Sequence, residues 1–202
     1  MKITNHTATA DNVEKNFNMS YKQPSATMVT EDDEKGAWMD EDGVKYSKDG
    51  KKLLTCTNKG LTDYPIRQGT EVICDEAFVE CESLQSVVIP SSVTTLGDSA
   101  FFWCGALRSV TIPDSVTNIG DCAFLGCSSL QSIAIPDSVT SIGVLAFEYC
   151  SSLQSIIIPA SVTTLGDHTF EGCSSLQSVI IPNSVTSIGE RAFFHRSEER
   201  RV

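Results

Sequence analysis

The fold of this chain is decided by the stretch IPDSVTNIGDCAFLGCSSLQSIAI, which runs from Ile112 to Ile135. Its landmarks return along the chain at a fixed interval of 23 residues. The phenylalanine column consists of Phe78, Phe101, Phe124, Phe147, Phe170 and Phe193. Columns of proline, glycine, cysteine and leucine keep the same interval. One short supersecondary unit is therefore copied along the chain, which is the sequence signature of a solenoid.

Each copy contains a short strand with one buried face. Ile133 and Ile135 alternate with Ser132 and Ala134, and an apolar residue at every second position is typical of such a strand. Because one strand cannot bury its apolar face alone, we expect the copies to stack in parallel, about 4.8 Å apart, around a shared core. The column proline ends each strand, and we expect the column glycine to adopt a positive φ. The alanine and phenylalanine that follow are expected to form a short helical or 3₁₀ turn.

The repeat resembles the leucine-rich repeats of the BspA-like (Treponema pallidum type) family, with the unit C-x-x-L-x-x-I-x-I-P-x-x-V-x-x-I-G-x-x-A-F. The match covers about residues 66 to 194, and its first copy is degenerate, with Arg67, Thr70 and Cys74 in the proline, valine and glycine columns. The predicted fold class is an α/β solenoid. It is a leucine-rich-repeat superhelix of about five to six 23-residue coils, with a parallel concave sheet and an N-terminal β-hairpin cap.

Four regions are expected along the chain. Residues 1–40 are polar and contain a Glu31-Asp32-Asp33-Glu34 cluster, so we expect a disordered acidic segment. Residues 41–65 are expected to form the hairpin cap, with a type I′ turn at Asp49-Gly50. Residues 66–194 form the repeat domain. Residues 195–202 are a charged tail that either blunts the last coil or marks a fragment of a longer array, and the fragment is favoured.

Charge argues against several partners. The net charge is −11, and Arg67, Arg108 and Arg191 are the basic residues of the repeat region. Binding to nucleic acid needs basic residues that neutralise phosphates, so no nucleic-acid partner is expected. We interpret the excess of acidic residues as keeping the solenoid soluble, rather than as recruiting a basic partner. No apolar run is long enough for a membrane span or a secretory signal. The chain as written is therefore expected to be cytoplasmic, or secreted or at the cell surface if the N-terminus is incomplete.

The sequence shows no catalytic or metal motif, so no enzyme, no cofactor and no metal site are predicted. The column cysteines are read as small buried hydrophobic residues, and no C-x-x-C pair that could hold zinc occurs. His168 shares a variable column with Ser99, Cys122, Leu145 and Arg191, and we expect this column to face solvent. The threonine column that contains Thr94 and Thr140 is expected to satisfy backbone groups of its own turns.

The candidate binding surface is the exposed side of the concave sheet. Its predicted residues are Ser86, Val88, Arg108, Ser109, Thr111, Ser132, Ala134, Ser155, Ile157, Ser178 and Ile180. The face becomes apolar at Ile157 and Ile180, which favours contact with a partner, although β-branched residues also suit a sheet for its own sake.

Relatives with this repeat are commonly surface or secreted adhesion and host-contact proteins. The resemblance therefore implies a non-catalytic module that binds a protein ligand through the concave sheet. Two alternatives stay open. In the first, the chain is structural: a stretch of a longer array, or a solenoid that self-associates through its C-terminal coil. In the second, it accompanies an enzymatic domain elsewhere.

Overall fold

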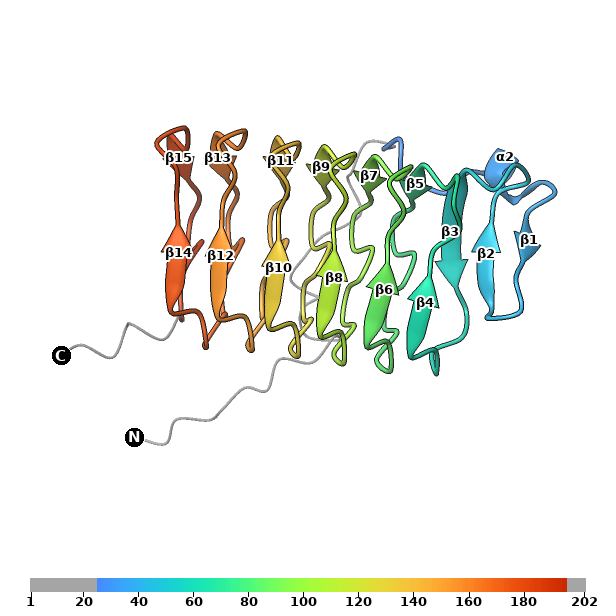
Figure 1. The fold of residues 1–202 in the computed structure, drawn as a ribbon, viewed down its shortest axis with the longest axis horizontal. Coiled ribbons are helices and arrows are strands. Elements are labelled where there is room, and N and C mark those ends of the chain that lie inside the picture. Colours follow the sequence, from blue (N-terminus) through green and yellow to red (C-terminus); the bar gives the residue numbers. More distant parts are fainter. Residues whose placement is uncertain (1–24, 196–202) are drawn as a thin grey trace.

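The computed structural model describes residues 25–195, which form a β-solenoid. Figure 1 shows the coils stacked in one row, from β1 near the N-terminal end to β14 and β15 at the other end. Each coil of the repeat adds one strand to each of two parallel ladders and returns through a series of turns. The stack and its 23-residue period confirm the solenoid expected from the sequence.

The longer strands form a six-stranded parallel sheet with the order β14-β12-β10-β8-β6-β4. Their bounds are β4 Asp63–Pro65, β6 Ser86–Val88, β8 Ser109–Thr111, β10 Ser132–Ala134, β12 Ser155–Ile157 and β14 Ser178–Ile180. Equivalent residues of neighbouring copies are partners, as in Ser86 with Ser109 and Val87 with Val110. Each coil is thus in register with the next.

The two-residue strands of the repeats and the N-terminal strands β1, β2 and β3 form the second ladder. Its seven-stranded part has the order β1-β2-β3-β5-β7-β9-β11, and β13 and β15 make a separate two-stranded sheet. The bounds are β1 Trp38–Met39, β2 Val44–Tyr46, β3 Lys52–Cys56, β5 Val72–Ile73, β7 Thr95–Leu96, β9 Asn118–Ile119, β11 Ser141–Ile142, β13 Thr164–Leu165 and β15 Ser187–Ile188.

The third side of each coil is a ladder of turns, and the α/β description does not fit. The N–H groups of Ser99, Phe101 and Trp103 each donate to a carbonyl of the next coil at 2.8 Å. Ser99 and Trp103 have positive φ values of 55° and 54°, which turn these amides toward the neighbouring coil. An α-helix would need them to bond within the coil. Among residues 25–195 the only helix is α2, Glu31–Glu34, outside the repeats.

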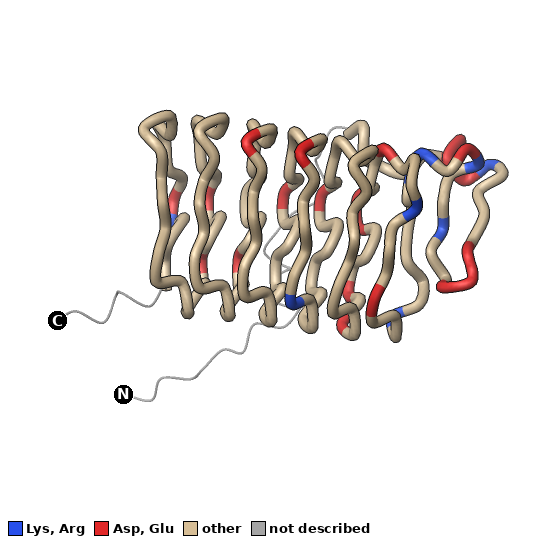
Figure 2. Tube along the Cα trace, in the orientation of Figure 1, with Lys and Arg blue, Asp and Glu red and all other residues tan. Residues whose placement is uncertain are grey.

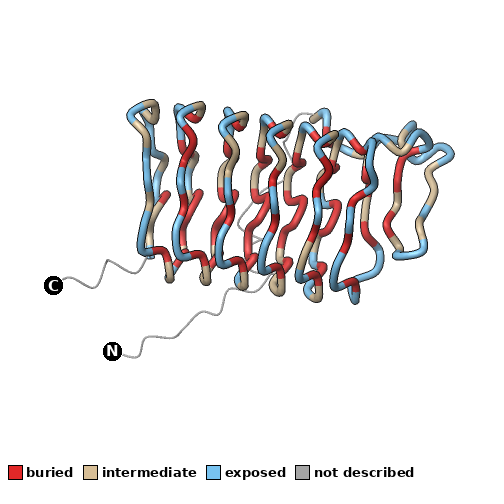
Figure 3. Tube along the Cα trace, in the orientation of Figure 1, coloured by how far each residue is buried: buried red, intermediate tan, exposed pale blue. Residues whose placement is uncertain are grey.

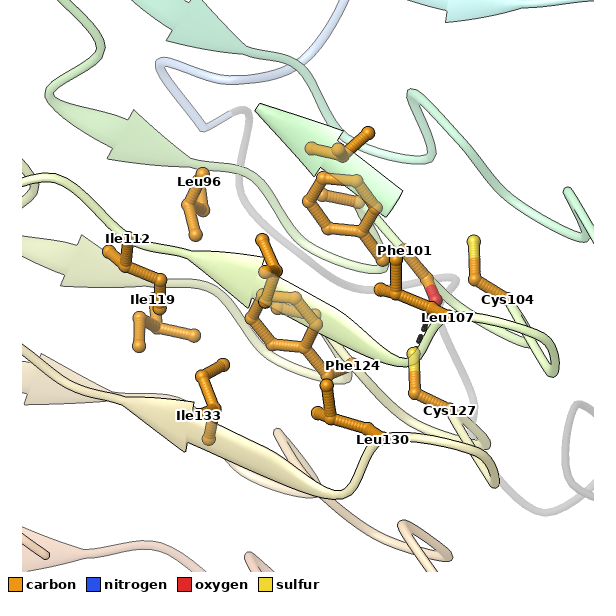
Figure 4. Packing of buried hydrophobic residues seen from close by; sticks show 14 of the residues in the cluster. Leu96, Phe101, Cys104, Leu107, Ile112, Ile119, Phe124, Cys127, Leu130 and Ile133 are labelled. Atoms are coloured by element: carbon orange, nitrogen blue, oxygen red, sulfur yellow. Dashed lines mark hydrogen bonds between the residues drawn. The ribbon is translucent and has the colours of Figure 1, made fainter. Parts of the chain in front are cut away.

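The phenylalanine column forms the spine of the core. Consecutive rings from Phe78 to Phe193 lie 5.2 to 5.4 Å apart and within 8° of parallel. Figure 4 shows Phe101 and Phe124 in this stack, beside Leu107 and Leu130 of the same two coils. The Cys127 thiol donates to the Phe101 carbonyl at 3.2 Å (Figure 4), and Cys104 and Cys150 repeat this bond. The cysteines are buried and free, so they both fill the core and join the coils.

The column glycines are required for close approach between coils, and the expectation of a positive φ was wrong. A Cβ on Gly120 would lie 2.6 Å from the carbonyl carbon and oxygen of Gly97. The positive φ falls two residues later instead, for example at Cys122 with a φ of 56°. Glycine is thus present because the coil before it leaves no room for a side chain.

Two polar columns also bond from coil to coil. The Thr94 hydroxyl donates to the carbonyl of Glu71, and Thr140 to that of Thr117, both at 3.3 Å. The acceptors lie one coil earlier, so the expected bonds within each threonine's own turn were wrong. The Asp98 carboxylate accepts the Asp121 N–H at 2.7 Å in the same manner. The threonine hydroxyls add a second bond to carbonyls that already accept a backbone N–H of the next coil at 2.9 Å, and the Asp98 carboxylate gives the Asp121 N–H a partner.

The N-terminal hairpin consists of antiparallel β2 and β3, and β3 pairs in parallel with β5. Its loop spans residues 47–51, and the Ser47 N–H donates to the Lys52 carbonyl at 2.9 Å. Gly50 has a positive φ of 74°, whereas Asp49 does not. A type I′ turn needs a positive φ at both central residues, so that turn type was wrong although the hairpin forms.

The described part of the segment 1–40 is ordered, in contrast to the expectation. The Ser25 hydroxyl donates to Asp75 at 3.0 Å, and the Asp75 N–H donates to the Thr27 carbonyl at 3.1 Å. Lys52 bonds to Asp33 of α2 at 2.9 Å. The acidic cluster therefore has nearby cations and a capping box at Thr30 to hold it. The predicted disorder of residues 1–24 and most of the charged tail, 196–202, lie outside the described residues.

Candidate protein-binding face

The six-stranded sheet presents one exposed face. Ser109 and Thr111 of β8 are exposed while Val110 between them is buried, and β10 and β12 repeat this alternation. Figure 3 shows exposed and buried residues alternating along the front strands of the coils. The period-two pattern therefore assigned the two sides of these strands correctly.

The structure places the predicted residues in two rows along this face, which we call the sheet face. The serine row consists of Ser86, Ser109, Ser132, Ser155 and Ser178. The second row consists of Val88, Thr111, Ala134, Ile157 and Ile180. Arg108 is exposed in the loop before β8, and its backbone N–H bonds to the Gln85 carbonyl at 3.0 Å. Because the coils stack in register, residues that are 23 positions apart in the sequence lie side by side on this face.

The second row is apolar at both ends. Ile157 and Ile180 are register partners with exposed fractions of 61% and 56%. Val88, at the other end, is 62% exposed. Thr111 and Ala134 separate the two apolar parts. Large aliphatic side chains left in water at adjacent positions are typical of contact surfaces.

The sheet face carries little charge. Strands β6, β8, β10, β12 and β14 contain no charged residue. Figure 2 shows the same stretches of chain in tan, with acidic and basic residues gathered at the N-terminal coils and on other sides of the solenoid. At the N-terminal edge, the Ser86 hydroxyl donates to Asp63 of β4 at 2.5 Å. A partner would contact hydroxyl and aliphatic groups here rather than a cluster of like charges.

A second apolar layer, which the sequence reasoning missed, lies outside the turn ladder. Phe102, Cys122, Leu125 and Leu145 are all at most 8% exposed and pack together. The expectation that the column of His168 faces solvent was therefore wrong for Ser99, Cys122 and Leu145, which are buried, whereas His168 is partly buried and Arg191 is exposed. All members of the column have a positive φ, and what covers Cys122 and Leu145 is packing with Phe102 and Leu125. The signal in the sequence was the apolar column Phe102, Leu125.

Among residues 25–195 one group of side chains is close enough to hold a metal ion. Glu148, His168 and Glu171 each offer one ligand atom, and these atoms lie within 4.8 Å of one another. They belong to two adjacent coils on the turn ladder, so they are not part of the sheet face. The sequence predicts no metal site here, because Glu148 and His168 lie in different copies of the repeat and come together only when the coils stack.

Stacked coils in which a buried column leucine comes just before the strand that each coil gives to one parallel sheet define a leucine-rich repeat solenoid. The family model described as "BspA type Leucine rich repeat region" matches residues 71–199 in six copies. The chain belongs to this family. Such families are typically found in surface and protein-interaction proteins and are generally non-catalytic.

Solved structures of bacterial proteins share the fold. A leucine rich cell surface protein from Faecalibacterium prausnitzii is 33% identical, with a TM-score of 0.65 over 69% of this chain and 38% of its own. The leucine-rich repeat protein of T. pallidum is 26% identical, with a TM-score of 0.54 over 84% of this chain and 86% of its own. A leucine-rich repeat protein from Eubacterium ventriosum, 20% identical, has a TM-score of 0.64 over 82% of this chain and 51% of its own.

The chain thus spans about two fifths of the F. prausnitzii protein and about half of the E. ventriosum protein. No curated protein matches the sequence. Within the described residues, every helix is too short or too polar to cross a bilayer.

Proposed function

We propose that this chain is a non-catalytic module that binds a protein ligand through the sheet face. The observation that supports the proposal is the exposed pair Ile157 and Ile180 on strands that contain no charged residue. Burying apolar surface contributes about 25 cal/mol per Å², so a partner that covers both side chains gains affinity without desolvating a charge. The F. prausnitzii relative is described as a cell surface protein, which favours a ligand met outside the producing cell.

The remaining regions fit this role. Residues 41–65 act as a cap in this proposal, because Tyr64 packs against Phe78, the first ring of the spine, at 6.0 Å. The Tyr46 and Tyr64 hydroxyl groups are hydrogen-bonded at 2.6 Å and tie β2 to this end of the core. The repeat domain at 66–194 then carries the ligand.

Binding proteins selected from a displayed library against the whole chain test the proposal. Ile157→Asp and Ile180→Asp place a charge on the sheet face without disturbing the core, and each should weaken selected binders at least tenfold. Asn183→Asp adds the same charge at an exposed position after the strand and should leave binding unchanged. Circular dichroism checks that each variant is folded. Undiminished binding by both isoleucine variants would refute the sheet face as the site.

Self-association is the second candidate, favoured by the last described coil. Ile181 and Ile188 are 39% and 50% exposed, whereas Ile158 and Leu165, their equivalents in the preceding coil, are each 2% exposed. Strands β14 and β15 are also edge strands, whose free backbone groups favour pairing with another chain. Light scattering over a concentration series should then show growth that Phe193→Lys suppresses. A particle size that is independent of concentration excludes this candidate and leaves the ligand-binding proposal intact.

A further inference from the structure

The turn ladder contains a place where the repeat departs from its own pattern. The column that holds Val79, Phe102, Leu125 and Phe194 in other copies holds Glu148 and Glu171 in two adjacent coils. Three positions before Glu171, His168 occupies the column of Cys122 and Leu145. In other copies, residues of these two columns pack in the second apolar layer. Packing in this layer does not explain three ionisable residues at the same positions.

The three side chains are held together at this place. Glu148 and Glu171 are each only 6% exposed, and His168 is partly buried. The Nδ1 atom of His168 is hydrogen-bonded to Oε2 of Glu171, and an Arg191 guanidinium nitrogen lies 3.4 Å from Oε1 of Glu171. Glu171 is therefore supported on both oxygens.

Glu148 lacks such support on one oxygen. Its Oε2 atom is buried and has no hydrogen-bond partner among the described residues. Burial and the neighbouring Glu171 carboxylate raise the pKa of Glu148 to about 7, although His168 and Arg191 oppose the shift. Buried carboxylates are normally paired, hydrogen-bonded or bound to a metal ion, because desolvation without compensation costs several kcal/mol or more. Arg191 does not serve Glu148 in this way, since it contacts Glu171 and lies over the Phe194 ring at 4.3 Å.

We propose that Glu148, His168 and Glu171 form a binding site for a divalent transition-metal ion of the Zn²⁺ class. One imidazole nitrogen and two carboxylate oxygens suit Zn²⁺, whereas Ca²⁺ and Mg²⁺ favour oxygen ligands alone. Ligand atoms about 2.0 to 2.2 Å from a tetrahedral Zn²⁺ lie roughly 3.4 Å apart. The observed spread of up to 4.8 Å closes with side-chain adjustment of about 1 Å.

The site joins two coils of the solenoid. Glu148 belongs to the coil of β12, and His168 and Glu171 precede β14 in the next coil. A metal ion bound here would stabilise the interface between these coils, because it binds the folded chain and lacks a preformed site in the unfolded chain. Three protein ligands also leave a coordination position for water or for a group of a partner.

Calorimetric titration of the chelator-treated, reduced full chain with ZnCl₂ tests the proposal. We expect one ion per chain, with affinity lowered by about tenfold or more in Glu148→Gln and in His168→Ser, since even loss of an outer partner of a metal ligand costs 10- to 100-fold. Glu190→Gln removes a nearby exposed carboxylate and should bind Zn²⁺ as the unchanged chain does. Because the chain has eight free thiols, Co²⁺ is titrated in parallel. Thiolate ligands would be revealed by strong near-ultraviolet absorption that a carboxylate and imidazole site lacks.

A second measurement uses the pattern of the repeat itself. Glu148→Leu restores the residue that stands one coil earlier at Leu125, so the metal-free variant should melt no lower than the unchanged chain. Zn²⁺ should raise the melting temperature of the unchanged chain and not of this variant. Absence of Zn²⁺ binding, equal affinity in Glu148→Gln and His168→Ser, or a thiolate spectrum would each overturn the proposal. Should one variant fail to fold, the other ligand variant decides the question.

Discussion

The substitution Gly120→Ala tests the reason for the glycine column. The new Cβ would lie 2.6 Å from the carbonyl carbon and oxygen of Gly97 and 2.7 Å from the backbone nitrogen of Asp98. Carbon atoms in ordinary contact are about 3.5 to 4.0 Å apart, so two coils must separate by about 1 Å at this point. The structure offers no flexible side chain that could move away instead.

The cost has two parts. Overpacking of a close-packed interior typically costs about 1 to 3 kcal/mol. Separation of the coils also strains the bond from the Gly120 N–H to the Leu96 carbonyl, 3.0 Å, and that from the Asp121 N–H to Asp98, 2.7 Å. Each such bond contributes about 0.5 to 1.5 kcal/mol. We therefore expect Gly120→Ala to lower the free energy of unfolding by about 2 to 6 kcal/mol.

Urea denaturation followed by circular dichroism measures this change. Gly105→Ala is the matched control in the preceding coil, because its Cβ would meet only Ser128 Oγ at 3.8 Å, and a change within about 0.5 kcal/mol is expected. Gly120→Asn separates the two explanations of the column. Asparagine tolerates a positive φ. If φ were the constraint, Gly120→Asn would therefore lower the free energy of unfolding less than Gly120→Ala. If space is the constraint, Gly120→Asn should lower it at least as much. Equal stability of the Gly120 and Gly105 variants would refute the reasoning.

Two further predictions concern the core. Phe124→Ala should lower the free energy of unfolding by about 3 to 5 kcal/mol, because Phe124 is fully buried between Phe101 and Phe147. Phe193→Ala, at the end of the stack with one ring neighbour, should cost about half of that, and equal costs by urea denaturation would contradict the stacked spine. Burial raises the pKa of Cys104 and of Cys173 to about 12, so both thiols stay protonated at pH 8 and should resist iodoacetamide in the native chain while reacting fully in guanidinium. Mass spectrometry of the peptides reads this out, and rapid native labelling of both would show that the coils open readily.

Much of the fold was predictable because each coil contacts mainly its neighbours. The period-two alternation around Val110 identified the buried and exposed sides of the strand, and the 23-residue interval identified which residues are neighbours. The helical or 3₁₀ turn expected at Ala100-Phe101 does not form, because the N–H groups of Ser99, Phe101 and Trp103 bond to the next coil, with positive φ values at Ser99 and Trp103. Non-glycine residues rarely adopt this conformation without such support.

The sequence alone determined the coil length, the strands, the phenylalanine spine and the residues that share the sheet face, since all of these follow from local alternation and an unbroken repeat. Only the tertiary structure decided what happens between coils. It showed that Gly120 is needed for space, that Thr94 bonds to the preceding coil, and that Glu148 meets His168 across an interface. The physical reason is that these contacts depend on how closely and in what rotation one coil rests on the next, a quantity that the residues of a single copy do not encode.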